Sequence, residues 1–355
     1  MKFIHCSDIH LDSKMERNLS PAQARERNAE VCATFSRLVS FAVEQGVKAV
    51  IIAGDLFDTQ RTTDRTVGFV LDTIRTAHQV DFLYLRGNHD VSGFEGQELP
   101  ENLMLFGPEW TYRRYENVMV AGMDPMGEAW ETYYDALSLP EETANIVTLH
   151  GQISTQPGAE LIALPKLKRK YIDYLALGHI HSYQAGRLDD RGSWCYCGCL
   201  EGRGFDECGE KGFVLVNVEN GQVTQKFVPF AHRKLEEVPV DITDMTTVSQ
   251  ILAAAVSATR EVPESSLVKL TLTGTFTLET QKDLDFLKKM MEGKFWFLKV
   301  KDESRLKIEK ETYEHDISLK GEFIRLVMAS DKTDEEKEQM IFWGIRALSG
   351  EEVAL

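Results

Sequence analysis

The 355-residue sequence lacks any long hydrophobic run. No apolar stretch approaches the roughly 20 residues that cross a bilayer, so we expect no attachment to a membrane. The first residues include His5, Asp8 and His10 where a secretory signal needs an unbroken apolar core, which favours a cytoplasmic protein. The six cysteines follow no framework spacing, and this indicates reduced thiols and not a disulfide scaffold.

Basic charge is also scarce. The chain has 40 Lys and Arg residues against 56 Asp and Glu residues, a formal net charge of −16. This balance argues against a protein held on nucleic acid by a broad basic surface. Two exceptions stay open: a local basic patch, or carboxylates that are neutralised by bound metal ions.

The sequence contains short β-rich apolar runs that alternate with helical stretches, the pattern of a layered α/β domain. One helix is expected to begin after Ser20, an N-cap residue followed by Pro21, and to end before Gly46. After Phe230 the pattern changes to a small β-α-β-α-β unit. Its strands are expected at 235–240, 266–272 and 294–300, its helices at 247–259 and 278–291, and two further helices at 321–328 and 333–348.

Five expected strands each end in residues that can bind a metal ion. Because the carboxyl ends of strands form the ligand crevice of α/β sheets, we expect these residues to converge. A single histidine at a strand end is most often a buried, hydrogen-bonded residue, but five such ends in one chain are not explained that way. The strands at 3–7, 47–53, 82–85, 145–149 and 174–177 lead to Asp8, Gly54-Asp55, Gly87-Asn88-His89-Asp90, His150 and Gly178-His179-Ile180-His181.

These donors are Asp, His and Asn side chains with no thiolate, a set that suits Mn²⁺, Fe²⁺ or Zn²⁺. Alternate residues of a strand share a face, so Asp8 and His10 are expected on one side, as are His179 and His181. Seven donors exceed what one ion needs, and we expect two ions that share Asp55 as a bridging carboxylate. Two ions about 3.5–4 Å apart activate a water molecule and bind a phosphate group.

Cleavage of a phosphodiester also needs a proton donor for the departing oxygen. His89 follows the expected ligand Asn88, so it is the candidate donor. Asp58, three residues after Asp55, is expected to orient this imidazole by a hydrogen bond to its other nitrogen.

The ordered motifs resemble those of the calcineurin-like metallophosphoesterase superfamily. The motifs are Asp8-x-His10, Gly54-Asp55-x-x-Asp58, Gly87-Asn88-His89-Asp90, His150-Gly151 and Gly178-His179-x-His181. Within this superfamily, the chain resembles SbcD-type DNA repair exonuclease subunits. Four segments carry this resemblance: residues 3–12, the Gly-Asp-Leu-Phe-Asp motif at 54–58, and residues 196–199 and 202–205. One departure is Asp58, because some nucleases of this family have histidine there.

The resemblance implies a four-layered αββα metallophosphoesterase domain at 1–230. It also implies a capping domain at 231–312 that guides DNA, and a C-terminal helical hairpin at 317–355 that could bind the coiled-coil base of an SbcC-type ATPase. The first ion would bind Asp8, His10, Asp55 and His181, and the second would bind Asp55, Asn88, His150 and His179. His89 would be the phosphate-facing acid, with Asp58 as its partner.

From these observations we expect a manganese-dependent phosphodiesterase that cleaves DNA as an exonuclease or endonuclease in repair. DNA and an SbcC-like ATPase are the expected partners, and a homodimer is compatible with this function. A small-molecule or nucleotide phosphodiesterase is the alternative that the acidic charge favours. In a third interpretation the chain is mainly an interaction subunit, and the hairpin either docks a partner or packs on its own domain.

The cysteines Cys195, Cys197 and Cys199, with Cys208, allow two interpretations. They could bind zinc, but their spacing is not the Cys-x-x-Cys of structural zinc sites. Alternation along a strand before a turn is the interpretation that we prefer.

Overall fold

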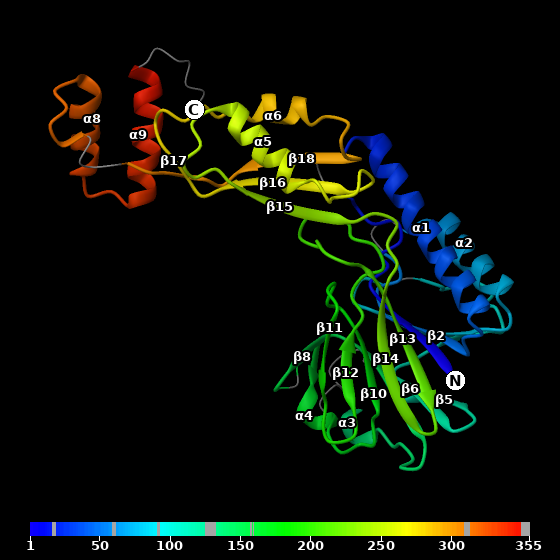
Figure 1. Cartoon of the computed structure of the whole chain (residues 1–355). Coiled ribbons are helices and arrows are strands. Elements are labelled where there is room, and N and C mark those ends of the chain that lie inside the picture. The colour runs from blue at the N-terminus through cyan, green and yellow to red at the C-terminus, as the bar shows by residue number, and fades with distance from the viewer. Residues whose placement is uncertain are drawn as a thin grey trace. The chain divides into compact units, whose positions relative to one another are not determined.

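A computed structural model of the chain describes residues 1–15, 19–58, 62–90, 93–124, 133–156, 158, 160–308 and 313–348. The chain divides into two compact units, Met1–Leu235 and Glu236–Leu355, and Figure 1 labels many of their elements. The ends of the expected capping domain, 309–312, and of the hairpin, 349–355, lie outside the described residues. Within those ranges, no helix combines the length and the apolar character that a bilayer crossing requires.

Two six-stranded sheets form the first unit. The first sheet runs in the order β14 (Gln222–Pro229), β13 (Gly212–Glu219), β1 (Lys2–Cys6), β2 (Ala49–Ala53), β3 (Asp81–Leu85) and β4 (Leu103–Leu105). The second runs β11 (Gln184–Arg187), β12 (Ser193–Tyr196), β10 (Tyr174–Gly178), β7 (Ala144–His150), β6 (Val118–Gly122) and β5 (Thr111–Tyr115). A two-stranded sheet pairs β8 (Gln152–Ser154) with β9 (Leu161–Ala163). Because β1, β2 and β3 are parallel, and β7 and β10 are parallel, their carboxyl ends lie at common sheet edges.

The helices of this unit are α1 (Pro21–Glu44), α2 (Asp64–Thr76), α3 (Tyr133–Ala136) and α4 (Leu164–Leu167). The side chain of Ser20 accepts a hydrogen bond from Gln23 N, and the side chain of Gln23 accepts one from Ser20 N. This capping box and Pro21 at the first turn start α1 where the sequence predicts it.

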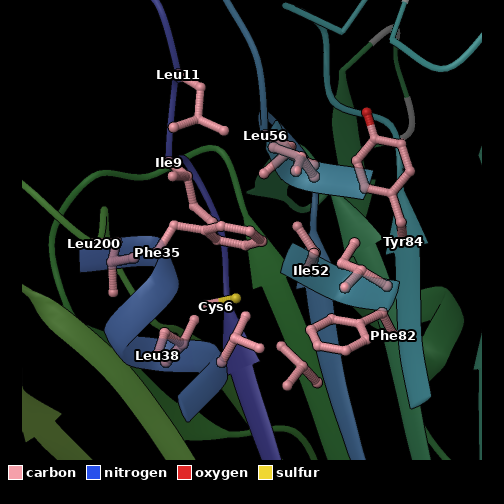
Figure 2. Packing of buried hydrophobic residues seen from close by; sticks show 14 of the residues in the cluster. Cys6, Ile9, Leu11, Phe35, Leu38, Ile52, Leu56, Phe82, Tyr84 and Leu200 are labelled. Carbon is pink, nitrogen blue, oxygen red and sulfur yellow. The ribbon is translucent and has the colours of Figure 1, made fainter. Parts of the chain in front are cut away.

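Three hydrophobic cores separate the layers of the first unit. In the first core, Phe35 and Leu38 of α1 pack against Ile52 and Phe82 of the first sheet, as Figure 2 shows. The second core lies between the two sheets and includes Phe3, Ile51, Ile146 and Tyr174. The third core covers the outer face of the second sheet with residues of α3 and α4, among them Tyr133, Tyr134 and Leu167. The order is therefore helix, sheet, sheet, helix, which confirms the predicted αββα class.

The second unit contains a three-stranded sheet in the order β15-β16-β18 and a two-stranded sheet of β17 and β19. Its elements are β15 (Leu235–Asp241), α5 (Val248–Ala258), β16 (Leu267–Thr273), β17 (Thr275–Phe276), α6 (Leu284–Met290), β18 (Phe297–Asp302), β19 (Arg305–Leu306), α8 (Leu319–Met328) and α9 (Asp334–Leu348). The predicted β-α-β-α-β order is present.

The predicted start of the second helix in this unit, at 278, is wrong. Thr280 N donates to Thr277 O (3.1 Å), so the chain forms a turn at this point. The helix begins only at Leu284, where the side chain of Asp283 accepts a hydrogen bond from Phe286 N (2.8 Å). Local capping therefore decides the start against the apolar periodicity.

The two C-terminal helices share a core with the rest of the second unit. Ile324 of α8 and Ile341 of α9 belong to the same buried cluster as Leu270 of β16. Thr333 and Glu336 form a capping box at the start of α9, with Thr333 N donating to Glu336 Oε2 (2.9 Å) and Glu336 N donating to Thr333 Oγ1 (3.2 Å). The hairpin thus packs on its own unit.

Candidate metal centre

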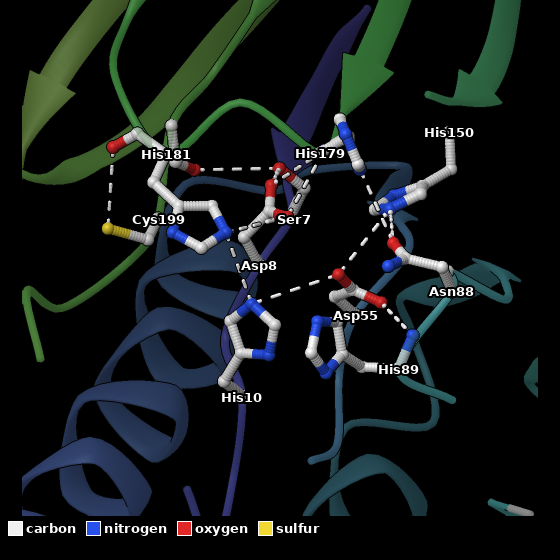
Figure 3. Close-up of polar contacts among 12 residues, drawn as sticks. Ser7, Asp8, His10, Asp55, Asn88, His89, His150, His179, His181 and Cys199 are labelled. Carbon is white, nitrogen blue, oxygen red and sulfur yellow. Dashed lines mark hydrogen bonds and ion pairs between the residues drawn. The ribbon is translucent and has the colours of Figure 1, made fainter. Parts of the chain in front are cut away.

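The predicted ligands follow the carboxyl ends of five strands from both sheets of the first unit. Figure 3 shows their side chains converging. Asp8 and His10 follow β1, Asp55 follows β2, and Asn88 follows β3 in the first sheet; His150 ends β7, and His179 and His181 follow β10 in the second. The site therefore lies where the edges of the two sheets meet.

Four of the ligands have a left-handed backbone: φ is 50° at Asp8, 49° at His10, 53° at Asp55 and 101° at His179. Such angles cost about 1–3 kcal/mol each for non-glycine residues and cluster at functional sites. Asp8 and His10 do lie in one group of ligand atoms, but strand alternation is not the reason, because β1 ends at Cys6. Their direction comes instead from this left-handed backbone and from hydrogen bonds to the segment after β2, in which Asp8 N donates to Gly54 O and His10 N donates to Asp55 O, both at 3.0 Å.

Glycines bring the strand ends close together. A Cβ atom on Gly54 would collide with the ring of His150, and one on Gly87 would collide with Asp55. A Cβ atom on Gly178 would collide with the carbonyl oxygen of Ala53. Glycine at positions 54, 87 and 178 therefore permits the close approach of these strand ends.

One group of ligand atoms surrounds a point beside β1. Nε2 of His10 lies 3.3 Å from Nε2 of His181 and 3.8 Å from Oδ2 of Asp55. Nε2 of His181 lies 3.6 Å from Oδ1 of Asp8. Asp8, His10 and His181 thus offer three atoms that lie within 4.8 Å of one another.

A second group lies beside β7. Nε2 of His150 is 3.4 Å from Oδ2 of Asp55 and 3.0 Å from Oδ1 of Asn88. Nδ1 of His179 is 3.3 Å from the same Asn88 oxygen. Oδ2 of Asp55 therefore faces both groups, and Asp8 also lies within 4.8 Å of Asp55 and His150.

The residues fit divalent ions on two counts. Atoms bound about 2.0–2.2 Å from a common ion lie roughly 3–3.6 Å apart, close to the separations here. In addition, Nδ1 of His150 lies 2.8 Å from the carbonyl oxygen of Ala53 and so carries a proton. In neutral His150 the lone pair on Nε2 would face Oδ2 of Asp55 and Oδ1 of Asn88. These three atoms are all acceptors, so they cannot form hydrogen bonds with one another, but a cation can bind all three.

Charge at the site follows the same geometry. Burial by itself lowers the pKa of His150, but the carboxylates of Asp55 and Asp8 raise it to about 9. Burial alone would raise the pKa of Asp55, yet the hydrogen bond and charge of His150 hold it well below its usual range. His150 and Asp55 thus stabilise the charged forms of each other.

The sequence model of calcineurin-like phosphoesterases matches residues 1–183, just over half of the chain. The chain belongs to the calcineurin-like phosphoesterase family. Members of this family are hydrolases that use divalent metal ions, in agreement with the two groups of ligand atoms.

Three individual proteins similar to this calcineurin-like phosphoesterase are informative to different degrees. The metallophosphoesterase YhaO of Bacillus subtilis, an uncharacterized protein, is 29% identical over 343 residues, 86% of this chain and 82% of that protein. The DNA double-strand break repair protein Mre11 of Sulfolobus acidocaldarius is 31% identical over 204 residues, 53% of this chain and 52% of that protein. The matched region thus spans about half the length of this Mre11 relative. A solved dimetal phosphatase from Danio rerio is 12% identical, and the match covers 64% of this chain and 95% of that chain with a TM-score of 0.42.

His89 lies at the solvent side of the phosphoesterase site. Its side chain is 47% exposed, and its Nδ1 lies 3.9 Å from Oδ1 of Asp58. This separation is too long for the predicted hydrogen bond and suits an ion pair once His89 is protonated. The backbone N–H of His89 donates to Oδ1 of Asp55 (2.8 Å), so the loop that carries His89 is tied to the shared carboxylate.

Sequence reasoning assigned no role to Asp90, which the structure places beneath the ligand loops. Its buried carboxylate accepts hydrogen bonds from Leu56 N (3.2 Å), Phe57 N (2.7 Å) and Gly87 N (3.0 Å). Burial and the neighbouring Asp55 raise the pKa of Asp90 to about 6. Asp90 thereby joins the loop after β2 to the loop after β3. Its place in the Gly-Asn-His-Asp motif was the available signal.

Glu207 was also missed: it lies two residues after the segment 202–205, to which sequence reasoning assigned no role. Its Oε1 lies 2.7 Å from Nδ1 of His181. Burial alone would raise the pKa of Glu207, but hydrogen bonds from His181 and Arg203 hold it well below its usual range. Of the nearby cysteines, Cys195 lies in β12, whereas Cys197 and Cys199 follow the end of that strand at Tyr196, so the preferred strand interpretation holds for Cys195 alone.

Proposed function

We propose that this protein is a two-metal phosphodiesterase of the SbcD type that cleaves DNA ends in repair. The observation that carries the proposal is the position of Asp55, whose Oδ2 lies 3.8 Å from Nε2 of His10 and 3.4 Å from Nε2 of His150. One carboxylate oxygen between two groups of ligands is the arrangement that two ions close together require.

The ligand roles follow from the two groups. Asp8, His10, Asp55 and His181 would hold the first ion, and Asp55, Asn88, His150 and His179 would hold the second. Imidazole, carboxylate and amide donors without thiolate suit Mn²⁺, which we propose as the ion, and they also admit Fe²⁺ or Zn²⁺. When bound, two such ions lower the pKa of a water molecule and neutralise charge on the phosphate.

Residues of the chain supply the remaining chemistry. His89, at the exposed edge of the site, would donate a proton to the departing oxygen of the substrate. Asp58, whose Oδ1 lies 3.9 Å from Nδ1 of His89, would help to orient this imidazole. The hydrogen bond from His89 N to Asp55 keeps the donor in register with the ligands.

DNA is the proposed substrate because relatives such as Sulfolobus acidocaldarius Mre11 are DNA double-strand break repair proteins. The net charge of −16 favours the alternative, a small-molecule or nucleotide phosphodiesterase.

We further propose that the protein acts in the cytoplasm with an SbcC-like coiled-coil ATPase as its partner. Leu319 and Leu326 of α8 are exposed and are candidate contact residues for this partner. If the chain were mainly an interaction subunit, this partner would bind while the metal centre was dispensable.

The test compares substrates with Mn²⁺ as the metal. End-labelled single-stranded and duplex oligonucleotides are assayed beside bis-p-nitrophenyl phosphate and cyclic nucleotides, with the Asp55→Asn variant as the control for contaminating nucleases. We expect Mn²⁺-dependent cleavage of DNA by the wild-type protein only. Rapid turnover of a small diester without cleavage of any DNA would refute the nuclease assignment.

A further inference from the structure

A single segment of the chain holds His181 from two sides. The ring nitrogen Nδ1 lies 2.7 Å from Oε1 of Glu207. The backbone carbonyl of His181 accepts a hydrogen bond from Nζ of the buried Lys211 (2.6 Å). Both partners belong to the loop that precedes β13, whereas His181 follows β10 of the other sheet.

Glu207 is itself fixed by Arg203. Nη2 and Nε of Arg203 donate to Oε1 of Glu207 at 2.7 Å and 3.1 Å. The backbone N–H of Arg203 donates to Oε2 at 2.8 Å. With its side chain only 5% exposed and both oxygens engaged, Glu207 has little rotational freedom.

This geometry selects one tautomer of His181. A carboxylate only accepts hydrogen bonds, so a nitrogen 2.7 Å from Oε1 must carry the proton. Nη2 of Arg203 is 3.1 Å from the same nitrogen, but a bare Nδ1 that accepted from it would face the acceptor Oε1 of Glu207 at 2.7 Å with no hydrogen between them. Nε2 of His181 is therefore left with its lone pair, and it faces Oδ1 of Asp8 at 3.6 Å and Nε2 of His10 at 3.3 Å.

We propose that Glu207 and Arg203 are positioning residues for the first metal ion. Glu207 fixes the ring orientation and tautomer of His181 and makes Nε2 a stronger donor, and Arg203 locks Glu207 in place. The inference rests on the proposed metal centre. Carboxylates in this position typically contribute 10–100-fold to metal affinity.

Binding of Mn²⁺ alone tests the inference without any substrate. Metal-free wild-type protein is titrated with Mn²⁺, and free Mn²⁺ is measured by its electron paramagnetic resonance signal. We expect two equivalents to bind. Glu207→Ala should weaken one of them about 10–100-fold and leave the other near its wild-type affinity.

Two further variants complete the design. Glu207→Gln keeps an oxygen that accepts from Nδ1, so it should recover part of the lost affinity, and it serves as the main variant if Glu207→Ala does not fold. Asp173→Ala is the matched control, because Asp173 also forms a partly buried pair with an arginine, Arg191 at 3.0 Å, but precedes β10 at the end away from the ligands. It should bind both equivalents normally.

The outcomes separate this inference from the proposed function. Wild-type affinity for both equivalents in Glu207→Ala would overturn the positioning role, and so would equal weakening in Asp173→Ala. Wild-type protein that binds no Mn²⁺ would overturn the metal centre and the positioning role together. If the wild-type protein binds two equivalents of Mn²⁺ but does not cleave DNA, only the substrate assignment is refuted. The ratio of Mn²⁺ affinities between the wild type and Glu207→Ala would still decide the role of Glu207.

Discussion

Oδ2 of Asp55 lies 3.4 Å from Nε2 of His150, although Asp55 follows β2 in one sheet and His150 ends β7 in the other. This contact joins the two sheets at the candidate metal centre. Gly54, directly before Asp55, makes the approach feasible, because a Cβ atom there would collide with the His150 ring. The shared carboxylate therefore depends on the packing of one sheet against the other as well as on the residue types.

Removal of the shared carboxylate should cost both metal and activity. In Asp55→Asn the negative charge between the two groups of ligands is lost, and the amide nitrogen faces atoms that require a cation. We expect metal content per chain to fall well below that of the wild type, together with turnover of bis-p-nitrophenyl phosphate. Elemental analysis of the purified proteins measures this, with the exposed carboxylate variant Asp72→Asn as control; unchanged metal content in Asp55→Asn would contradict the bridging role.

Replacement of His89 should separate catalysis from metal binding. His89→Ala removes the proposed proton donor, whose ring is not among the predicted ligands, so both ions should be retained. Loss of a general acid typically lowers turnover by about 10²–10⁴-fold. Metal analysis and steady-state kinetics of His89→Ala, beside the exposed histidine variant His78→Ala, measure the two effects. A metal-depleted His89→Ala protein would show that His89 acts as a ligand instead.

The C-terminal hairpin should contribute to the stability of the second unit. Ile341 is completely buried in the core shared with β16, and Ile341→Ala should lower the free energy of unfolding by about 2–5 kcal/mol. Leu326 is 67% exposed, so Leu326→Ala should change it by only about 0.5 kcal/mol. Urea unfolding of the full chain compares the two variants, and equal stability would mean that the hairpin does not pack on its own unit in solution.

Acid should destabilise the metal-free protein partly through His5. His5 is completely buried with Nδ1 2.8 Å from the hydroxyl oxygen of Tyr174, and burial lowers its pKa from 6.5 to about 3. In the unfolded chain His5 is therefore protonated below about pH 6.5, whereas in the folded chain it stays neutral down to about pH 3. The contribution of this group to stability is present above pH 6.5 and decreases as the pH falls, by up to about 1.4 kcal/mol per unit.

Urea unfolding in EDTA at pH 7.5, 6.0 and 5.0 measures this contribution. His5→Asn retains a partner for Tyr174 but cannot be protonated, so its stability should fall less steeply than that of the wild type. The exposed histidine variant His315→Asn should follow the wild-type profile. Identical profiles for wild type and His5→Asn would show that His5 is not the group responsible.

The sequence alone was sufficient to predict the layered α/β class and the residues at the five strand ends. At each of these strand ends an apolar run is followed directly by glycine or polar residues. The order of neighbouring residues in the sequence therefore indicates where the strand ends and which side chain follows it. The capping box at the start of α9, from Thr333 to Glu336, was predictable for the same reason, because its partners are three residues apart.

Tertiary structure decided the relations between distant residues. The directions of Asp8 and His10 come from left-handed turns paired with Gly54 and Asp55, which strand alternation does not describe. Glu207 reaches His181 only because the loop before β13 crosses to the end of β10, and no local pattern encodes that path. The hairpin packs on its own unit because the apolar surface of α8 and α9 fits that of the rest of the unit. The sequence pattern cannot predict this fit, since hydrophobic burial itself is non-directional.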